Sequence, residues 1–509
     1  MGRGLFAKVL IGTPQWILLV ATAIVSAIVT IVIVSAGGGK YFFALCGGIG
    51  LVFGVLLSGN PRLFFLYAVV LTAPLDFSKR FIKVPHMGGA SAIRIEMIDI
   101  FLIPLILFIL RDFYKGYRTD FRMPEPLKWW ILLGLLGGYF ILMGPYRTNA
   151  VLEIFRMLKL TVLMLVIVNE VVRRKHFEHL AAAMMLSVIL QSIIGILQYI
   201  NDKPLGLHLL GEATPEVVEL LSKATLQGGA WVYRISALLG HANLFSIFLS
   251  SQLPIALALL FARTRLFVRI LSMLALLTGC MALILTLSRT GWVTAAAAMG
   301  AVMLLSFWHP QLRSQFLVGR LAVIIGGAAV ALAFSGKIMQ RLFKSDEGAV
   351  DVRFEWLEVA WGMIQAKPVM GWGLNTFVFQ MGPFTQYGSY DKMYDVYGEN
   401  LPVVHNVYAL ITAEQGFVGM FIFLIFIISI LIMGFKALSV KNQVMHALAL
   451  GGICGFGVYL LDWLASFSLR MDHMGRMFFI LLGLIAAVNY WRIYNEKNLK
   501  VCTRSGLTP

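Results

Sequence analysis

The stretch PVVHNVYALITAEQGFVGMFIFLIFIISILIMGF, residues 402–435, decides what kind of protein this chain is. From Val407 onward it contains a single charged residue, Glu414, among large apolar side chains. About 20 such residues, coiled as a helix, cross the roughly 30 Å hydrocarbon core of a bilayer. We therefore expect a membrane-spanning helix that carries His405 and Asn406 in its first turn, where water meets membrane.

The composition extends this expectation to the whole chain. Of its 509 residues, 59% are hydrophobic and 13% charged, with a mean hydropathy of +0.83, which excludes an ordinary soluble globular protein. The apolar runs are continuous rather than alternating, which favours helices over a barrel. We expect an all-α polytopic membrane protein.

About fourteen apolar segments follow one another, and because the third and fourth are short, twelve to fourteen transmembrane helices are expected. They lie near residues 17–36, 41–57, 63–75, 97–110, 127–144, 151–168, 180–200, 244–262, 270–287, 293–308, 321–335, 405–435, 445–467 and 477–491.

The four cysteines form no CxxC pair, so neither a disulfide framework nor a zinc site is expected. The net charge of +17 comes from basic residues scattered through short loops. This pattern favours anionic membrane lipids as partners and argues against nucleic acid.

The basic loops also predict the orientation. Lys and Arg cluster at residues 111–118, 173–175, 263–269 and 312–320 and after Arg492, all on one side if every segment crosses. That side is the cytoplasm by the positive-inside rule, so the polar intervals 201–234 and 336–404 face outward. Four regions follow: N-terminal spans (1–200), first outer loop and central spans (201–335), a large periplasmic loop with an interfacial helix (336–404), and C-terminal spans with a cytoplasmic tail (405–509).

Two groups of charges do not fit this scheme. Residues 76–94 should lie outside, yet they carry Lys79, Arg80 and Lys83 as well as Arg94, so either the flanking segments are misassigned or these charges meet an anion. Glu153, Arg156 and Lys159 begin the sixth segment at helical spacing. There Arg156 and Lys159 either reach toward the lipid head groups or form an anion pocket between helices.

Other residues that could carry chemistry stand at the outward ends of apolar runs. Arg289 lies in SRTGW between two such runs, and RISALLGHAN at residues 234–243 brings Arg234, His241 and Asn243 close together. Arg289 could simply cap helix carbonyls, and His241 could be a capping or core histidine.

Residues 351–377, DVRFEWLEVAWGMIQAKPVMGWGLNTF, predict an amphipathic helix along the membrane surface with Asp351 as its N-cap and Arg353 in its first turn. Its apolar positions are Val352, Trp356, Val359, Trp361, Met363 and Ile364. A sharp turn through Gly371 and Gly373 follows.

The position of His405 near a helix N-terminus disfavours the imidazolium, because the helix dipole is positive there. A neutral imidazole is a competent general base, worth roughly 10² to 10⁴ in rate when it is positioned on a hydroxyl. Tyr408 and Thr412 share the helix face of His405, whereas Glu414 lies half a turn away and is expected to pair with a neighbour. Gly416 and Gly419 would let another helix approach.

Taken in order, these pieces resemble the O-antigen ligase and polymerase superfamily. The resemblance covers roughly residues 234–435 and rests on RISALLGHAN (234–243), LSRTGW (287–292), VRFEWLEVAW (352–361), KPVMGWGLNTF (367–377) and HNVYALITAEQGFVG (405–419).

The resemblance implies a glycosyltransferase of the C-type class in the bacterial cytoplasmic (inner) membrane, with its active site facing the periplasm. It implies an undecaprenyl-diphosphate-linked glycan donor, a glycan or lipid-glycan acceptor, an inverting reaction, and neither metal nor cofactor. His405 would be the catalytic base. Arg289 would bind the diphosphate with help from Arg234 or Arg353, and Arg156, Lys159 and the loop at 79–83 would be secondary contacts. Asn406, Tyr408, Glu414, His241 and Asn243 would support the acceptor or the site.

Three questions stay open at this stage. A ligase and a polymerase use the same donor chemistry and differ in the acceptor. A flippase for lipid-linked oligosaccharides also has twelve to fourteen helices, although paired repeats, which such transporters usually have, are not visible here. A structural scaffold would not need arginines at successive outward helix ends.

Overall fold

The computed structural model describes residues 54, 59–84, 88–214, 223–225, 231–308, 349–398 and 401–504. The chain divides into two compact units, Met1–Ala68 and Val69–Pro509. Of the first unit the structure describes mainly the beginning of helix α4, and everything below concerns the second.

Helices dominate the described residues. They are α4 (Pro61–Thr72), α5 (Met97–Tyr114), α6 (Glu125–Met143), α7 (Arg147–Glu170), α8 (Arg174–Asn201), α10 (Ala242–Leu260), α11 (Leu266–Leu285), α12 (Arg289–Trp308), α16 (Ala349–Ala366), α17 (Phe377–Gln380), α18 (Tyr390–Tyr397), α19 (Val407–Ala437), α20 (Gln443–Asp462) and α21 (Asp472–Arg504), with 3-10 turns η1 (His208–Leu210), η2 (Gly382–Phe384) and η3 (Ser468–Arg470).

Two short antiparallel hairpins accompany the helices. β1 (Ser78–Lys83) pairs with β2 (Ala92–Glu96), and β3 (Lys223–Thr225) pairs with β4 (Trp231–Tyr233). The sequence analysis predicted neither hairpin.

Within the described residues, eight helices are long and apolar enough to cross a membrane, namely α6, α8, α10, α11, α12, α19, α20 and α21. The protein is thus an all-α polytopic membrane protein, as predicted. The expected spans at 17–36 and 321–335, and nearly all of 41–57, lie outside the described residues, so the count of twelve to fourteen stays a prediction. The expected third segment is α4, whose 12 residues reach only about 18 Å.

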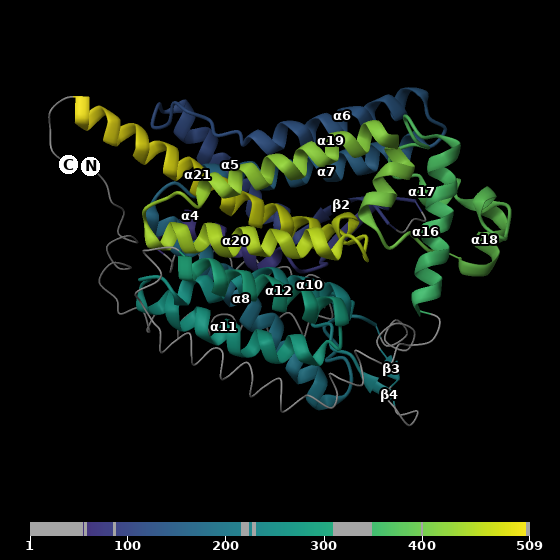
Figure 1. Ribbon diagram of the computed structural model, residues 1–509, viewed down its shortest axis with the longest axis horizontal. Coiled ribbons are helices and arrows are strands. Elements are labelled where there is room, and N and C mark those ends of the chain that lie inside the picture. The colour runs from purple at the N-terminus through teal and green to yellow at the C-terminus, as the bar shows by residue number, and fades with distance from the viewer. Residues whose placement is uncertain are drawn as a thin grey trace, which may run out of the picture. The chain divides into compact units, whose positions relative to one another are not determined.

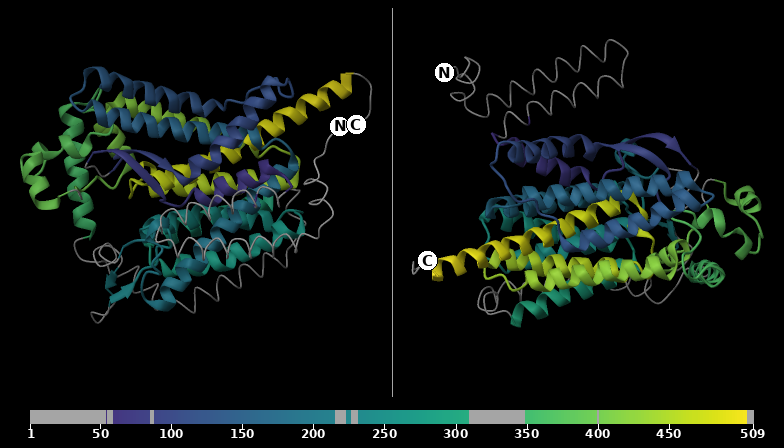
Figure 2. Two further views of the ribbon diagram at one scale, coloured as in Figure 1. Left: turned by 180° about the vertical axis from the view of Figure 1, so that it is seen from behind. Right: turned by 90° about the horizontal axis from the view of Figure 1, so that it is seen from above.

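The helices form two packed groups (Figures 1 and 2). One contains α8, α10, α11, α12 and α20, the other contains α5, α6, α7, α19 and α21, and α20 packs against α21 to join them. α10 and α20 approach closely because Gly455 faces the backbone of Ser251, where a side chain would collide with the Ser251 carbonyl.

α16 runs across the end of these helices rather than along them, with α18 beyond it (Figure 1). We call this end, where α10, α12 and α19 begin and α20 ends, the site end. Trp356, Met363 and Ile364 of α16 are buried against residues such as Phe377 and Leu401, so the predicted amphipathic helix exists. Three details were wrong: the helix begins at Ala349 and so includes Asp351, and both Val352 and Trp361 are exposed.

α19 begins at Val407, not at His405 as predicted. The side chain of Asn406 is the N-cap and accepts a hydrogen bond from the backbone N–H of Ala409 (2.9 Å), which leaves His405 just outside the helix. His405 therefore does not share a helix face with Tyr408 and Thr412.

α19 is interrupted at Gly416, whose φ of 64° and ψ of −170° are not helical. The segment 368–373 fills the interruption. Phe417 and Val418 donate backbone hydrogen bonds to the carbonyls of Pro368 (2.7 Å) and Val369 (3.3 Å). In return, Trp372 and Gly373 donate to the carbonyls of Ala413 (3.1 Å) and Glu414 (2.8 Å). The interruption thus leaves these four backbone groups paired inside the protein.

Gly416 was expected to admit a neighbouring helix, but it admits this loop instead. A Cβ there would collide with the carbonyl of Val369. Gly371, with a φ of 73°, faces Glu414 in the same way, since its Cβ would lie 2.5 Å from the Glu414 carbonyl carbon.

Gly416→Ala should therefore destabilise the protein. The backbone region that Gly416 occupies costs other residues about 1–3 kcal/mol, before the collision with Val369 is counted. Thermal unfolding of purified protein in detergent would measure this as a lower midpoint.

Gly300→Ala is the matched control, because Gly300 lies in α12 and nothing lies within 4 Å of a Cβ added there. Its midpoint should stay unchanged or rise, since alanine is the better helix former. Equal midpoints for the Gly416→Ala and Gly300→Ala variants would show that the interruption is not under steric constraint.

Candidate active site

His405 is held at the site end by the residues on either side of it. Val407 donates a backbone hydrogen bond to the carbonyl of Trp463 (2.9 Å), and the Asn406 side chain donates to the carbonyl of Leu464 (3.1 Å). The ring of Phe467 packs against the His405 ring at 78°, with centroids 5.2 Å apart. The end of α20 and the loop after it therefore fix the position of the imidazole.

The imidazole of His405 is partly buried, and its surroundings favour the neutral form. Burial and then the positive charge of Arg353 lower the pKa of His405, and the backbone of Val403 acts in the opposite direction. The sequence analysis expected a neutral histidine because of the helix dipole. The structure adds desolvation and a neighbouring cation as causes.

Arg234, His241 and Asn243 lie together, as the sequence predicted. The Arg234 guanidinium donates to the Asn243 side chain (2.7 Å) and to the carbonyl of Thr286 (3.0 Å), and His241 caps α10 by accepting from the backbone N–H of Asn243 (3.1 Å). These bonds join the loop before α10 to the end of α11.

Arg289 is the first residue of α12, where a helix N-terminus favours anions. The preceding Ser288 accepts a hydrogen bond from Ser246 of α10 (3.0 Å), which fixes the two helix starts against each other. In the described part of the chain, no ion pair occupies the Arg289 guanidinium. It is thus one cation at this end whose charge is not neutralised.

Arg353 interacts electrostatically with residues of the other segments described above. Loss of solvation and then the positive charge of Arg289 lower the pKa of Arg353, and Asp462 opposes them. Burial, followed by the charges of Arg234, His405 and Arg353, lowers the pKa of His241 to about 3. Electrostatic interactions therefore link residues from four separate parts of the sequence. We call them the cationic cluster: the arginines Arg234, Arg289 and Arg353 with the histidines His241 and His405, whose surroundings favour the neutral form.

Asp462 belongs to this environment and was missed by the sequence analysis. It is buried at the end of α20, accepts a hydrogen bond from Ser468 (2.7 Å), and acts on Arg353. The signal was available, because Asp462 is the only charged residue in the apolar run 445–467. Ionisable residues inside such runs are functional candidates by default.

The remaining residues that the sequence analysis assigned to the site lie outside the cationic cluster. Tyr408 donates its hydroxyl to the carbonyl of Leu460 in α20 (3.1 Å). Glu414 is fully buried, accepts from the backbone N–H of Phe377 (3.1 Å) and forms an ion pair with Arg470. Arg470 also pairs with Glu153 of α7 (2.9 Å), so one guanidinium ties together two buried carboxylates.

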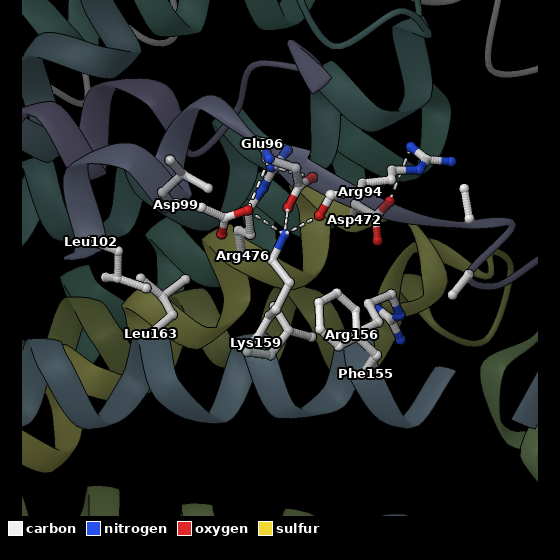
Figure 3. A pocket seen from close by; sticks show the side chains of 14 residues that line it. Arg94, Glu96, Asp99, Leu102, Phe155, Arg156, Lys159, Leu163, Asp472 and Arg476 are labelled. Carbon is white, nitrogen blue, oxygen red and sulfur yellow. Dashed lines mark hydrogen bonds and ion pairs between the residues drawn. The ribbon is translucent and has the colours of Figure 1, made fainter. Parts of the chain in front are cut away.

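Arg156 has partners for all three guanidinium nitrogens: two bonds reach Glu153 and one reaches the carbonyl of Leu469 (3.1 Å). The Lys159 ammonium lies 2.6 Å from Glu96 and 2.7 Å from Asp99 (Figure 3). The cavity beside Lys159 measures about 30 Å³, room for ordered water. Arg156 is thus paired with Glu153, and Lys159 shares Glu96 with Arg476, so this geometry gives no support to their assignment as diphosphate contacts.

Comparison with known protein families supplies an independent observation. Residues 273–424 match the family described as O-antigen ligase. Over this stretch the chain is similar to O-antigen ligases. The matched stretch contains Arg289, Arg353 and His405, while Arg234 lies before it and Asp462 after it. No curated protein matches the chain.

Arg470 should be essential for the stability of the protein, because it is the ion-pair partner of Glu414 among the described residues. Arg470→Met leaves the buried carboxylate of Glu414 without a cation, and breaking a buried pair in this way costs about 3–5 kcal/mol. Chemical unfolding in detergent would measure the loss, and adding Glu414→Gln to the Arg470→Met variant should recover part of it.

Lys128→Met provides the control, because Lys128 and Glu125 form an exposed pair at 2.6 Å, worth less than about 1 kcal/mol. If the Arg470→Met and Lys128→Met variants unfolded alike, the buried pairs would not stabilise the fold.

Proposed function

We propose that the protein is a membrane glycosyltransferase that transfers glycan from undecaprenyl diphosphate to an acceptor hydroxyl. The observation that carries the proposal is the cationic cluster at the site end, three of whose members, Arg289, Arg353 and His405, lie in the stretch that matches O-antigen ligase. A site that joins a neutral imidazole to several arginines suits a reaction in which a hydroxyl loses a proton and a diphosphate leaves.

In this proposal His405 is the general base. It removes the proton from the acceptor hydroxyl as the oxygen attacks the anomeric carbon of the donor sugar. The bond from that carbon to the diphosphate breaks, and the diphosphate carries away the electron pair. Attack from the face opposite the leaving group inverts the anomeric carbon.

Arg289 and Arg353 stabilise the charge that develops on the diphosphate. Guanidinium groups bind phosphate oxygens in a bidentate fashion, and the start of α12 adds backbone N–H groups and a favourable helix dipole. Arg234 lies next to them, anchored by Asn243 and Thr286. The charge of Asp462 favours the protonated form of Arg353. These residues supply the cationic charge of the site without a metal ion in the proposed chemistry.

The proposal places the site end on the periplasmic side of the bacterial inner membrane. The positive-inside rule supports this placement, since the basic segments 173–175 and 263–269 lie at the opposite ends of α8 and α11 from the cluster.

The acceptor decides between a ligase and a polymerase. Purified protein would be given lipid-linked repeat units with and without a second lipid-glycan. A ladder of products identifies a polymerase, a single transfer to the second lipid identifies a ligase, and donor movement without a new glycosidic bond would contradict a transferase and favour a flippase.

His405→Ala and Arg289→Ala should each reduce transfer by at least about 10²-fold, because they remove the base and a cation that stabilises the leaving group. Product formation from lipid-linked donor measures the effect in purified protein whose unfolding midpoint matches that of the wild type.

The matched controls are His208→Ala and Arg147→Ala, which remove exposed residues at the site end and should retain transfer. Wild-type rates in a folded His405→Ala variant would refute the role of His405.

The pH dependence of transfer should follow the lowered pKa of His405. A base works in its neutral form, so activity is expected to persist at pH 6.5, the ordinary histidine value, and to fall only at lower pH. Arg353→Gln removes one cause of the lowering and should move the acid limb of kcat/KM upward, toward 6.5. An acid limb above 6.5 in the wild type, or one that Arg353→Gln does not move, would contradict this account.

A further inference from the structure

The β1–β2 hairpin is anchored along one strand only. On β2, Ala92 and Glu96 are buried, and Arg94 pairs with Asp472 of α21 (3.1 Å). On β1, every residue after Ser78 is exposed. Within the described residues, then, the hairpin presents one whole strand that no other element covers.

The exposed strand is rich in large apolar side chains. Phe81 is 54% exposed and Ile82 is 52% exposed, and both stand where the register of the two strands shifts between Arg80 and Lys83. Phe77 and Ile95 beside them are 45% and 53% exposed. Such a cluster is unfavourable in water, and in a soluble domain it would mark an interaction surface.

The same strand carries positive charges that have few close carboxylate partners in the described structure. Lys79 lies over the ring of Phe81 (5.6 Å), and Arg80 reaches Asp76 only at 4.0 Å. In the part of the chain that the structure describes, Lys79 and Lys83 have no ion pair. By contrast, Arg94 and Lys159 nearby are closely paired.

The position of the hairpin along α7 follows from its contacts with that helix. Ala90 donates to Glu153, and Glu96 pairs with Lys159, residues that lie about 9 Å and 18 Å from the start of α7. The hairpin thus lies beside the first half of α7 instead of projecting beyond it, at the end that also holds α16 and α18 (Figure 2). A strand with an unpaired edge is not stable in hydrocarbon, whereas the head-group layer can hydrate that edge and admit apolar side chains.

We propose that the exposed strand of the β1–β2 hairpin, residues 77–83, is a docking surface for anionic phospholipids in the leaflet at the site end. Lys79, Arg80 and Lys83 bind the phosphate groups, while Phe81 and Ile82 lie among the upper acyl chains. The combination of cations and apolar residues on one strand fits a phospholipid, which offers both partners at this depth. The proposal does not depend on the proposed glycosyl transfer.

This docking has a consequence for the neighbouring site. The chain after β1 returns through Gly88, which packs against Val403, and Ala90, whose carbonyl accepts from Asn375 (2.9 Å). Val403 is two residues from His405. Lipid bound to the strand therefore fixes how deep the segment next to His405 lies relative to the membrane surface.

Spin labelling tests the proposal directly. A nitroxide is attached to Phe81→Cys, or to Ile82→Cys as a second site, in the full chain with its four native cysteines replaced, and the protein is placed in nanodiscs of phosphatidylcholine with or without phosphatidylglycerol. With phosphatidylglycerol present, the label should be several-fold more accessible to oxygen than to a water-soluble nickel complex. A label at Asp395→Cys, on the exposed surface of α18, should remain accessible to nickel.

The charge dependence is tested by Lys79→Gln, Arg80→Gln and Lys83→Gln together. This variant should lose the difference between the two nanodisc compositions while its unfolding midpoint stays unchanged, because none of these side chains has a close ion-pair partner in the described structure. A label at residues 81 and 82 that stays water-accessible in both nanodiscs would overturn the proposal. So would equal burial with and without phosphatidylglycerol, or burial that appears only when a polyprenyl diphosphate is added.

Discussion

The interruption of α19 at Gly416 is the constraint on which much of the site end depends. A membrane helix normally satisfies its own backbone, and here it exchanges four of those backbone hydrogen bonds for bonds to the segment 368–373. That exchange attaches the loop after α16 to a spanning helix. It thereby fixes the position of α16, which carries Arg353, relative to the start of α19, next to which His405 stands.

Buried charges extend this attachment to the other helices. Glu414 lies two residues before Gly416 and joins Arg470, which joins Glu153, and Glu153 accepts from the backbone of Ala90. Asn375 adds a further connection, because its side chain donates hydrogen bonds to the carbonyls of Ala90 and Asn149. These groups are expensive to desolvate, so each of them depends on its partners being in place. The result is a set of mutually dependent contacts that joins α7, α19 and the turn after α20.

The sequence predicted the helical class, the described spanning helices and the amphipathic helix α16 because these follow from apolar run length and periodicity, which are local properties. It predicted the start of α19 two residues too early, since Pro402 suits a helix start but the side chain of Asn406 makes the actual cap. It also missed the β1–β2 hairpin, whose strand β1 has basic and apolar residues without clear alternation. Arg289, Arg353 and His405 could be selected because short motifs surround them.

The long-range pairings could not be predicted in this way. From sequence, Arg156 and Arg289 both read as arginines near the outward end of a span, yet one is saturated by Glu153 and the carbonyl of a residue 313 positions away, while the other stands at a helix start among cations. Arg470 attracted no attention because neither of its partners is close to it in the chain. Local pattern shows which residues are unusual, and only the packing shows which of them are already paired.

The separation of Glu414 and Arg470 by 56 residues has a consequence for biogenesis. Glu153 emerges from the ribosome only three residues ahead of Arg156, so α7 enters the membrane with its carboxylate already matched. Glu414 has no neighbouring cation on α19. Its partner Arg470 is synthesised only after α20, in the turn that follows. We therefore expect Glu414 to be stably buried only after α20 and the turn that carries Arg470 have been made.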